Sequence, residues 1–154
     1  MPTITLRVDD PASPDACRLI AQLDAYQMRL YPQESNHLLS VEALRQPNVT
    51  FLTAWVDGRI AGCGAFVNRE GEYAEVKRMY VVPECRGLRL GRRILEELEC
   101  RIRASGLTCA RLETGVRQPE ALRLYEKAGY QRRGPFGEYA ADPLSVFLEK
   151  ALPR

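Results

Sequence analysis

The stretch from Val81 to Glu99, VVPECRGLRLGRRILEELE, places two glycines and four arginines in a turn between a β-branched run and a helix-like run. The first turn of a helix already carries exposed N–H groups and a positive field, so cations are unfavourable there unless an anion neutralises them. Gly87 and Gly91 would let successive N–H groups converge on such an anion. The arginines add charge suited to phosphate oxygens; they are Arg86, Arg89, Arg92 and Arg93. These residues predict a phosphate-binding turn.

Spacing alone leaves two other interpretations of this turn open. It could be an ordinary surface helix whose Arg92 and Arg93 pair with the glutamates four residues further on. Such pairs contribute only about 0.2 to 0.5 kcal/mol each and do not explain the glycines. Cys85 could be a nucleophile activated by the surrounding charge, although no second motif supports it. The glycine spacing matches neither the dinucleotide fingerprint nor the P-loop.

Composition narrows the class of protein. With 154 residues, 45% of them hydrophobic, the chain is expected to form a single domain over residues 1–154. No apolar run approaches the roughly 20 residues of a membrane span, and the first residues lack signal-peptide features. We therefore expect a cytoplasmic protein that contacts no membrane. The net charge of +2, with both signs interleaved, argues against nucleic acid as a partner.

The five cysteines suggest neither a metal site nor a disulfide framework, because they are odd in number, scattered and free of C-x-x-C spacing. We interpret them as reduced thiols and expect no metal.

Residue patterns predict a strand, two helices, three strands, a helix, a strand, a helix and two strands. Asp57-Gly58 marks a hairpin between the first two of the three consecutive strands, and Gly106 and Gly129 end helices. The predicted strands are 3–8, 51–56, 59–67, 72–82, 109–115, 130–133 and 145–152, and the predicted helices 14–30, 41–45, about 90–105 and 119–129. We expect a mixed sheet flanked by helices.

Two blocks of sequence resemble a known family. V-V-P-E-C-R-G-L-R-L-G is similar to the acetyl-CoA signature of the GCN5-related N-acetyltransferase (GNAT) superfamily, V-x-P-x-x-[RQ]-G-x-G-x-[GA], and LETGVRQPEALRLYEKAGY resembles its second block. YPQESNHLL and the ending GPFGEYAADPLSVFLEK resemble a branch of small bacterial members. The resemblance implies an α/β (α+β) fold, a mixed, mostly antiparallel sheet of about six to seven strands with about four helices. It also implies acetyl-CoA as cofactor.

The resemblance assigns the cofactor contacts residue by residue. The diphosphate of CoA would rest on the turn Arg86, Gly87, Leu88, Arg89, Leu90, Gly91 and Arg92, and the pantetheine beside Met79, Tyr80 and Val81. Gln118 matches a position where a side-chain amide holds the pantetheine, although a polar residue near a helix start is an equally good description. Arg89 departs from the pattern because the family has glycine there. We expect Arg89 to adopt ordinary helical angles and either to weaken CoA binding or to add a salt link to the phosphates.

Acetyl transfer needs a neutral amine, donors for the developing oxyanion and a proton for the leaving thiolate. By its spacing from Arg86, Glu75 resembles the catalytic glutamate of the histone-acetylating branch, and strand alternation would place it on one face with Lys77, Met79 and Val81. We prefer it as the base.

Glu113 is the second candidate base, because its spacing from Tyr125 resembles the branch that acetylates ribosomal-protein N-termini. Either glutamate could act through water, or be a salt partner of Lys77 or Arg111. Tyr125 matches the family tyrosine beside the CoA sulfur, and a phenol with an ordinary pKa of about 10 can protonate a thiolate. The other interpretation of Tyr125 is a half-buried aromatic of the helix.

The resemblance implies that the segment between the first two helices shapes the acceptor site, as it does in the family. Here it carries Tyr31, Ser35 and the lone His37, of which Ser35 could instead cap the next helix. Arg78 and Arg117 could each receive a substrate carboxylate in bidentate fashion. We therefore expect a small-molecule primary amine, with an amino acid as one example, as the acceptor.

Two other functions stay open at this point. One is acetylation of a protein or peptide, which would require an open cleft. The other is a CoA-binding sensor or interaction module that has lost turnover. This hypothesis is motivated by Arg89, which departs from the family signature. Members of the family often dimerise, but no residues here identify an interface.

Overall fold

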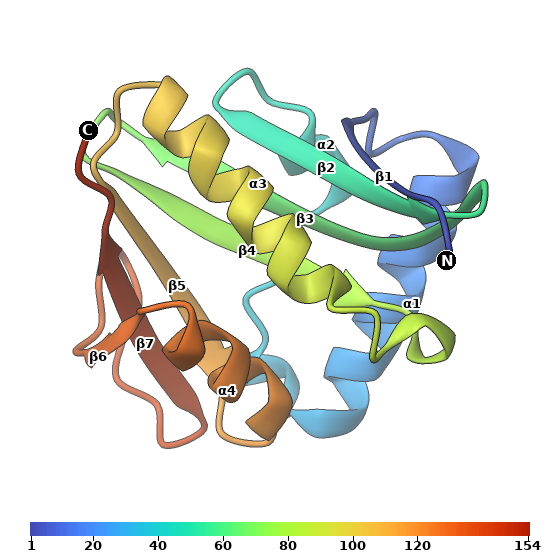
Figure 1. Ribbon diagram of the computed structural model, residues 1–154. Coiled ribbons are helices and arrows are strands. Elements are labelled where there is room, and N and C mark those ends of the chain that lie inside the picture. Colours follow the sequence, from blue (N-terminus) through green and yellow to red (C-terminus); the bar gives the residue numbers. More distant parts are fainter.

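The computed structural model describes residues 1–154 and contains the predicted elements in the predicted order (Figure 1). The strands are β1 (Ile4–Val8), β2 (Val49–Val56), β3 (Arg59–Arg69), β4 (Tyr73–Val81), β5 (Cys109–Gly115), β6 (Gln131–Arg133) and β7 (Ser145–Ala151). The α-helices are α1 (Pro14–Leu30), α2 (Val41–Leu44), α3 (Leu90–Ala104) and α4 (Pro119–Lys127), and short 3-10 helices span Gln33–Ser35 and Pro83–Cys85.

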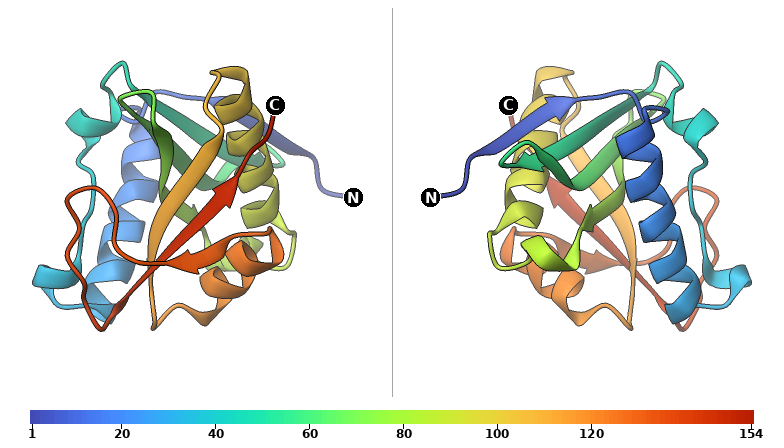
Figure 2. Two further views of the ribbon diagram at one scale, coloured as in Figure 1. Left: turned by 90° about the vertical axis from the view of Figure 1, so that its left-hand side faces the viewer. Right: turned by 90° about the vertical axis from the view of Figure 1, so that its right-hand side faces the viewer.

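All seven strands form one sheet in the order β1-β2-β3-β4-β5-β7-β6. Only β4 and β5 run parallel, and every other neighbouring pair is antiparallel. Helices α3 and α4 cover one face, and α1 and α2 cover the other (Figure 2). The expected mixed, mostly antiparallel sheet with four helices is confirmed. None of these helices is long and apolar enough to cross a bilayer.

Local sequence explains where these elements begin and turn. Ser13 caps α1, because its hydroxyl accepts the N–H of Ala16 at 3.3 Å and Pro14 supplies a preset helical φ. Between β2 and β3, Asp57 and Gly58 have φ of 50° and 81°, as a two-residue hairpin turn of the I′ kind requires. The apolar face of α3 is then fully buried against the sheet: Leu90, Ile94, Leu95, Leu98 and Ile102.

The strands β4 and β5 pair over a short distance and then separate. Their parallel register runs only from Ala74 opposite Ala110 to Val76 opposite Leu112. Beyond Leu112, β5 continues beside β7 to Gly115, while β4 continues beside β3 to Val81. The facing edges of the two strands are therefore unpaired where they diverge, and residues of both strands line a pocket there.

A β-bulge changes the direction in which the side chains of β4 point at this place. Lys77 pairs with Ala65 and Tyr80 with Cys63, so Arg78 and Met79 together oppose a single residue of β3. Arg78 has φ of 60°, in the left-handed region that non-glycine residues rarely adopt. The extra residue reverses the alternation of every side chain that follows it.

The expectation that Glu75, Lys77, Met79 and Val81 share one face is consequently wrong. A Cβ built on Gly64 would lie 2.6 Å from Met79 Sδ and 2.7 Å from a methyl of Ile94, so Met79 faces α3. Lys77 lies on the opposite face, where its Nζ donates to the carbonyl of His37 at 2.8 Å. Simple alternation fails because it assumes that no residue is inserted into the strand.

A buried polar network joins α3 to the end of the sheet. Glu99 on α3 is 5% exposed and accepts a hydrogen bond from Tyr130 Oη at 2.9 Å. Lys150 Nζ on β7 donates to its other oxygen at 2.8 Å. The Tyr130 ring in turn meets the Tyr125 ring edge to face at 5.8 Å. The network therefore supports one residue of the candidate site.

Replacing Glu99 with alanine should lower the free energy of unfolding by about 2 to 3 kcal/mol, because it leaves a half-buried ammonium and a buried phenol without their partner. Urea denaturation measures this change. Glu126→Ala is the matched control, since Glu126 pairs with Arg132 at an exposed position and should change stability by less than about 1 kcal/mol. Equal losses in the two variants would contradict the role assigned to Glu99.

Candidate active site

Two pockets adjoin each other, and the larger one lies between the end of β4, the start of α3 and α4. Its volume of about 940 Å³ is at the upper end of the range of about 300 to 1,000 Å³ for small-molecule sites. Every position that the family resemblance assigned to the cofactor lines it: Met79, Tyr80, Val81, Arg86, Gly87, Leu88, Arg89, Leu90, Gly91, Arg92 and Gln118. Sequence reasoning missed Tyr26 of α1 and Lys127 of α4, which also line this pocket.

The arginine turn has the backbone of an anion site. Gly87 and Arg89 have φ of 94° and 59°, and Arg89 is the residue before α3. No side chain caps this helix end, so its first N–H groups can serve a ligand. The expectation of ordinary helical angles at Arg89 is wrong. The chain keeps a glycine-like turn at this position without glycine.

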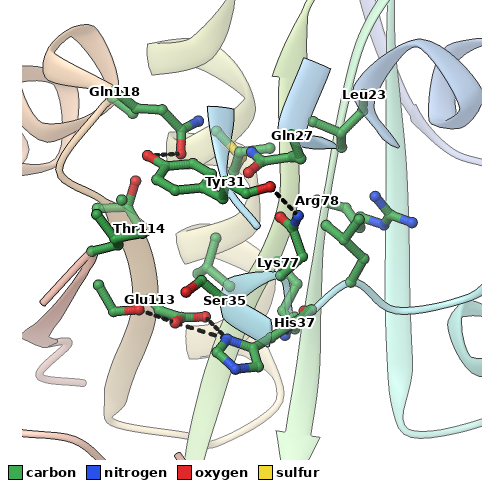
Figure 3. A pocket seen from close by; sticks show the side chains of 18 of the residues that line it. Leu23, Gln27, Tyr31, Ser35, His37, Lys77, Arg78, Glu113, Thr114 and Gln118 are labelled. Atoms are coloured by element: carbon green, nitrogen blue, oxygen red, sulfur yellow. Dashed lines mark hydrogen bonds and ion pairs between the residues drawn. The ribbon is translucent and has the colours of Figure 1, made fainter. Parts of the chain in front are cut away.

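The smaller pocket, of about 110 Å³, occupies the gap where β4 and β5 diverge. The segment from Tyr31 to Leu38 lies along it, and β4, β5, α4 and the loop before β7 complete it (Figure 3). The predicted catalytic and acceptor residues that line it are Tyr31, Ser35, His37, Glu75, Arg78, Glu113 and Tyr125. Arg117 does not line either pocket.

The two pockets meet. Met79 from β4, Gln118 from the turn before α4, and Ala121 and Tyr125 from α4 line both of them. A long ligand in the larger pocket and a small one in the smaller pocket would therefore approach each other beside these four side chains. The site can bring two molecules together, which is the first physical requirement of a group transfer.

Glu113 lies on the wall of the smaller pocket with its carboxylate held in place. Nδ1 of His37 is 2.9 Å from each of its oxygens (Figure 3). The hydroxyl of Ser145 donates to Oε2 at 2.7 Å. Its side chain is 12% exposed, and that of His37 is 35% exposed. A carboxylate has about four acceptor positions, so these contacts leave Glu113 able to accept from a bound amine.

Glu75 is enclosed by its partners. It is 2% exposed, it accepts from Arg69 Nε at 3.0 Å, and Tyr139 Oη donates to its other oxygen. Lys77 Nζ lies 3.6 Å from the same carboxylate. Burial lowers the pKa of Lys77, and burial raises the pKa of Tyr139 well above its usual value, so the phenol stays a donor. Arg69 and Lys77 therefore neutralise the charge of the Glu75 carboxylate, and these contacts support the pocket wall.

Tyr125 offers a free proton donor at the meeting point of the pockets. It is 6% exposed, and no hydrogen bond within the chain uses its hydroxyl. Burial raises the pKa of Tyr125 well above its ordinary value, so the phenol remains protonated throughout the neutral pH range.

Three of the predicted acceptor contacts are occupied by partners within the chain. Arg78 pairs with Asp24 at 2.6 Å, and its Nε and Nη2 donate to the Leu39 carbonyl at 3.0 and 2.8 Å. Arg117 donates to the carbonyl of Leu30. Ser35 donates to Asp142 at 2.6 Å. These contacts hold the segment that covers the pocket, and all three guanidinium nitrogens of Arg78 are engaged within the chain.

The chain is similar to known proteins in both sequence and structure. Residues 16–130 match the protein family described as the Acetyltransferase (GNAT) family. The chain is 48% identical to "IAA acetyltransferase" of Azospirillum brasilense, over 99% of this chain and 100% of that protein. It is 31% identical to "Uncharacterized N-acetyltransferase YsnE" of Bacillus subtilis, over 96% of this chain and 99% of that protein.

Among solved structures, a putative acyl-CoA N-acyltransferase from Klebsiella pneumoniae superposes with a TM-score of 0.80 at 39% sequence identity, covering 99% of this chain and 98% of that one. The similarity therefore extends over almost the whole length of both chains.

Arg89→Gly should raise the free energy of unfolding by about 0.5 to 1 kcal/mol. A left-handed conformation costs a non-glycine residue about 1 to 2 kcal/mol, and the greater conformational entropy that glycine loses on folding offsets part of the strain relieved. Thermal or urea unfolding measures it. Arg93→Gly, at an exposed helical position four residues on, should instead lower stability by about 1 kcal/mol. A loss of stability in both variants would contradict the strain assigned to Arg89.

Proposed function

Because the chain belongs to the Acetyltransferase (GNAT) family, we propose that it transfers the acetyl group of acetyl-CoA to the primary amine of a small molecule. The observation that carries this proposal is the meeting of the two pockets at Met79, Gln118 and Tyr125. Acetyl-CoA is a long, anionic cosubstrate that supplies an activated acetyl group as a thioester. The larger pocket is suited to its anionic portion, and the smaller pocket to an amine.

The larger pocket supports this placement through its charge and its backbone. The uncapped start of α3 and the side chains of Arg86, Arg89 and Arg92 offer N–H donors and positive charge for phosphate oxygens. From there the pocket follows Met79, Tyr80 and Val81 toward the junction, where the edge of β4 is not paired with β5. The chain can therefore hold an extended ligand along β4 with its reactive end at Tyr125.

At the junction, Glu113 is proposed as the proton acceptor. Its carboxylate faces the pocket and would attract an ammonium group, then take the proton, directly or through water, that the amine must lose before its nitrogen can attack the thioester carbon. Glu75 is less suited than Glu113, because Arg69, Lys77 and Tyr139 already surround its carboxylate. The sequence-based preference for Glu75 is therefore replaced.

Tyr125 is proposed as the proton donor. As the new C–N bond forms and the C–S bond breaks, the leaving sulfur needs a proton, and the protonated phenol of Tyr125 is the free donor that lines both pockets. The nitrogen that has formed the C–N bond gives up its extra proton to solvent, and the phenolate regains a proton from solvent. The products are the acetylated amine and the free thiol of CoA.

The size of the smaller pocket favours a small acceptor over a protein. Its volume is about 110 Å³, and Ser35, His37 and Lys77 tie the covering segment across it to Asp142, Glu113 and the sheet. An extended peptide would require an open groove at this place. Because the Azospirillum brasilense relative is named "IAA acetyltransferase", the compound in that name should be included in a first screen of acceptors.

Calorimetric titration with acetyl-CoA tests the proposal first. Micromolar affinity, about 8 kcal/mol of binding free energy, is expected, followed by acceptor-dependent release of free thiol in a screen of small amines. Absence of detectable binding would mean that the chain keeps the shape of the family without its cosubstrate. Binding without turnover on any amine would favour a CoA-binding sensor.

Glu113→Gln and Tyr125→Phe should each lower kcat by about 100-fold or more, because general acid–base groups contribute about 10² to 10⁴ in rate, while calorimetric affinity for acetyl-CoA changes little. Glu126→Gln on the exposed face of α4 is the control and should leave kcat unchanged. A fall in kcat for Glu75→Gln that exceeds that of Glu113→Gln would reverse the assignment of the base.

A further inference from the structure

A hydrogen bond between Tyr31 and Gln118 joins the walls of the two pockets. Tyr31 lines the smaller pocket at the end of α1, and Gln118 lines both pockets at the start of α4. Tyr31 Oη donates to Gln118 Oε1 at 3.1 Å (Figure 3). The two residues are 87 positions apart in the chain.

The direction of this bond is set by a second contact. The backbone N–H of Arg117 donates to the same hydroxyl at 3.1 Å. A phenol carries one proton, and because it accepts from Arg117 that proton is available for the amide oxygen of Gln118. The amide NH₂ of Gln118 then points away from Tyr31, and no group of the chain accepts a hydrogen bond from it.

The ring of Tyr31 is fixed by close packing as well. It is 6% exposed, and its own N–H donates to the Gln27 carbonyl at 3.0 Å. A Cβ built on Gly115 would lie 1.8 Å from Tyr31 Oη and 2.2 Å from Cζ. Any residue other than glycine at 115 would therefore displace the hydroxyl from Gln118.

We infer that Tyr31 is a positioning residue of the transfer reaction: it orients the Gln118 amide so that the NH₂ group faces the junction of the pockets. There the amide can donate to a carbonyl of the acyl donor. The inference rests on the proposed function for the identity of that donor. It assigns Tyr31 to the cosubstrate through Gln118, whereas sequence reasoning assigned it to the acceptor alone.

A double-mutant cycle with Tyr31→Phe and Gln118→Ala tests the inference, because phenylalanine removes only the hydroxyl. Each single variant should weaken calorimetric binding of acetyl-CoA about fivefold, the value of one hydrogen bond. The double variant should bind no more weakly than Gln118→Ala alone, since both changes break one interaction. Gly115→Ala, which displaces the ring but keeps the hydroxyl, should reproduce the effect of Tyr31→Phe.

Two further measurements separate positioning from general damage. In the free protein, the side-chain NH₂ signals of Gln118, identified by their loss in Gln118→Ala, should shift in the ¹H–¹⁵N spectrum of Tyr31→Phe. Tyr73→Phe, a buried tyrosine outside both pockets, should leave affinity and those signals unchanged.

Fully additive losses in the double variant, or unshifted Gln118 signals in Tyr31→Phe, would overturn the inference while leaving the proposed function intact. Failure of the wild-type protein to bind acetyl-CoA would instead refute the proposed function.

Discussion

The site depends on the separation of β4 and β5 after their short parallel pairing. Each strand continues beside its other neighbour, so the sheet remains connected while a gap opens between the two. The bulge at Arg78 turns Met79 toward α3 and leaves Lys77 on the opposite face, so β4 contributes to both pockets. Without this separation, β4 and β5 would satisfy each other's main-chain groups, and no space would remain for a second molecule beside Tyr125.

Around the gap, burial and pairing decide which polar side chains are free for chemistry. Glu75 and Glu99 are the more buried glutamates, and each is surrounded by donors that neutralise it. Both therefore hold the fold together. Glu113 and Tyr125 face the space between the strands with part of their hydrogen-bonding capacity unused. This difference in pairing is what favours Glu113 and Tyr125 for the proposed acid–base steps.

Sequence reasoning was most successful where the signal was local. Hydrophobic periodicity and turn residues predicted every strand and α-helix in order, and the arginine turn predicted the wall of the larger pocket. It failed where distant segments decide the outcome: alternation could not show the inserted residue in β4, and no local pattern marked Tyr139, from the irregular loop before β7, as a partner of Glu75. Nor could it show that Nη1 of Arg117, a predicted substrate contact, donates to the Leu30 carbonyl, which lies 87 residues away.

A crystal structure with bound acetyl-CoA would locate the thioester relative to the gap between β4 and β5. We expect the diphosphate at the start of α3 and the sulfur within about 3 to 3.5 Å of Tyr125 Oη, with the acetyl group directed toward Glu113. A thioester that lies outside the gap, or a sulfur too far from Tyr125 for a hydrogen bond, would contradict this expectation.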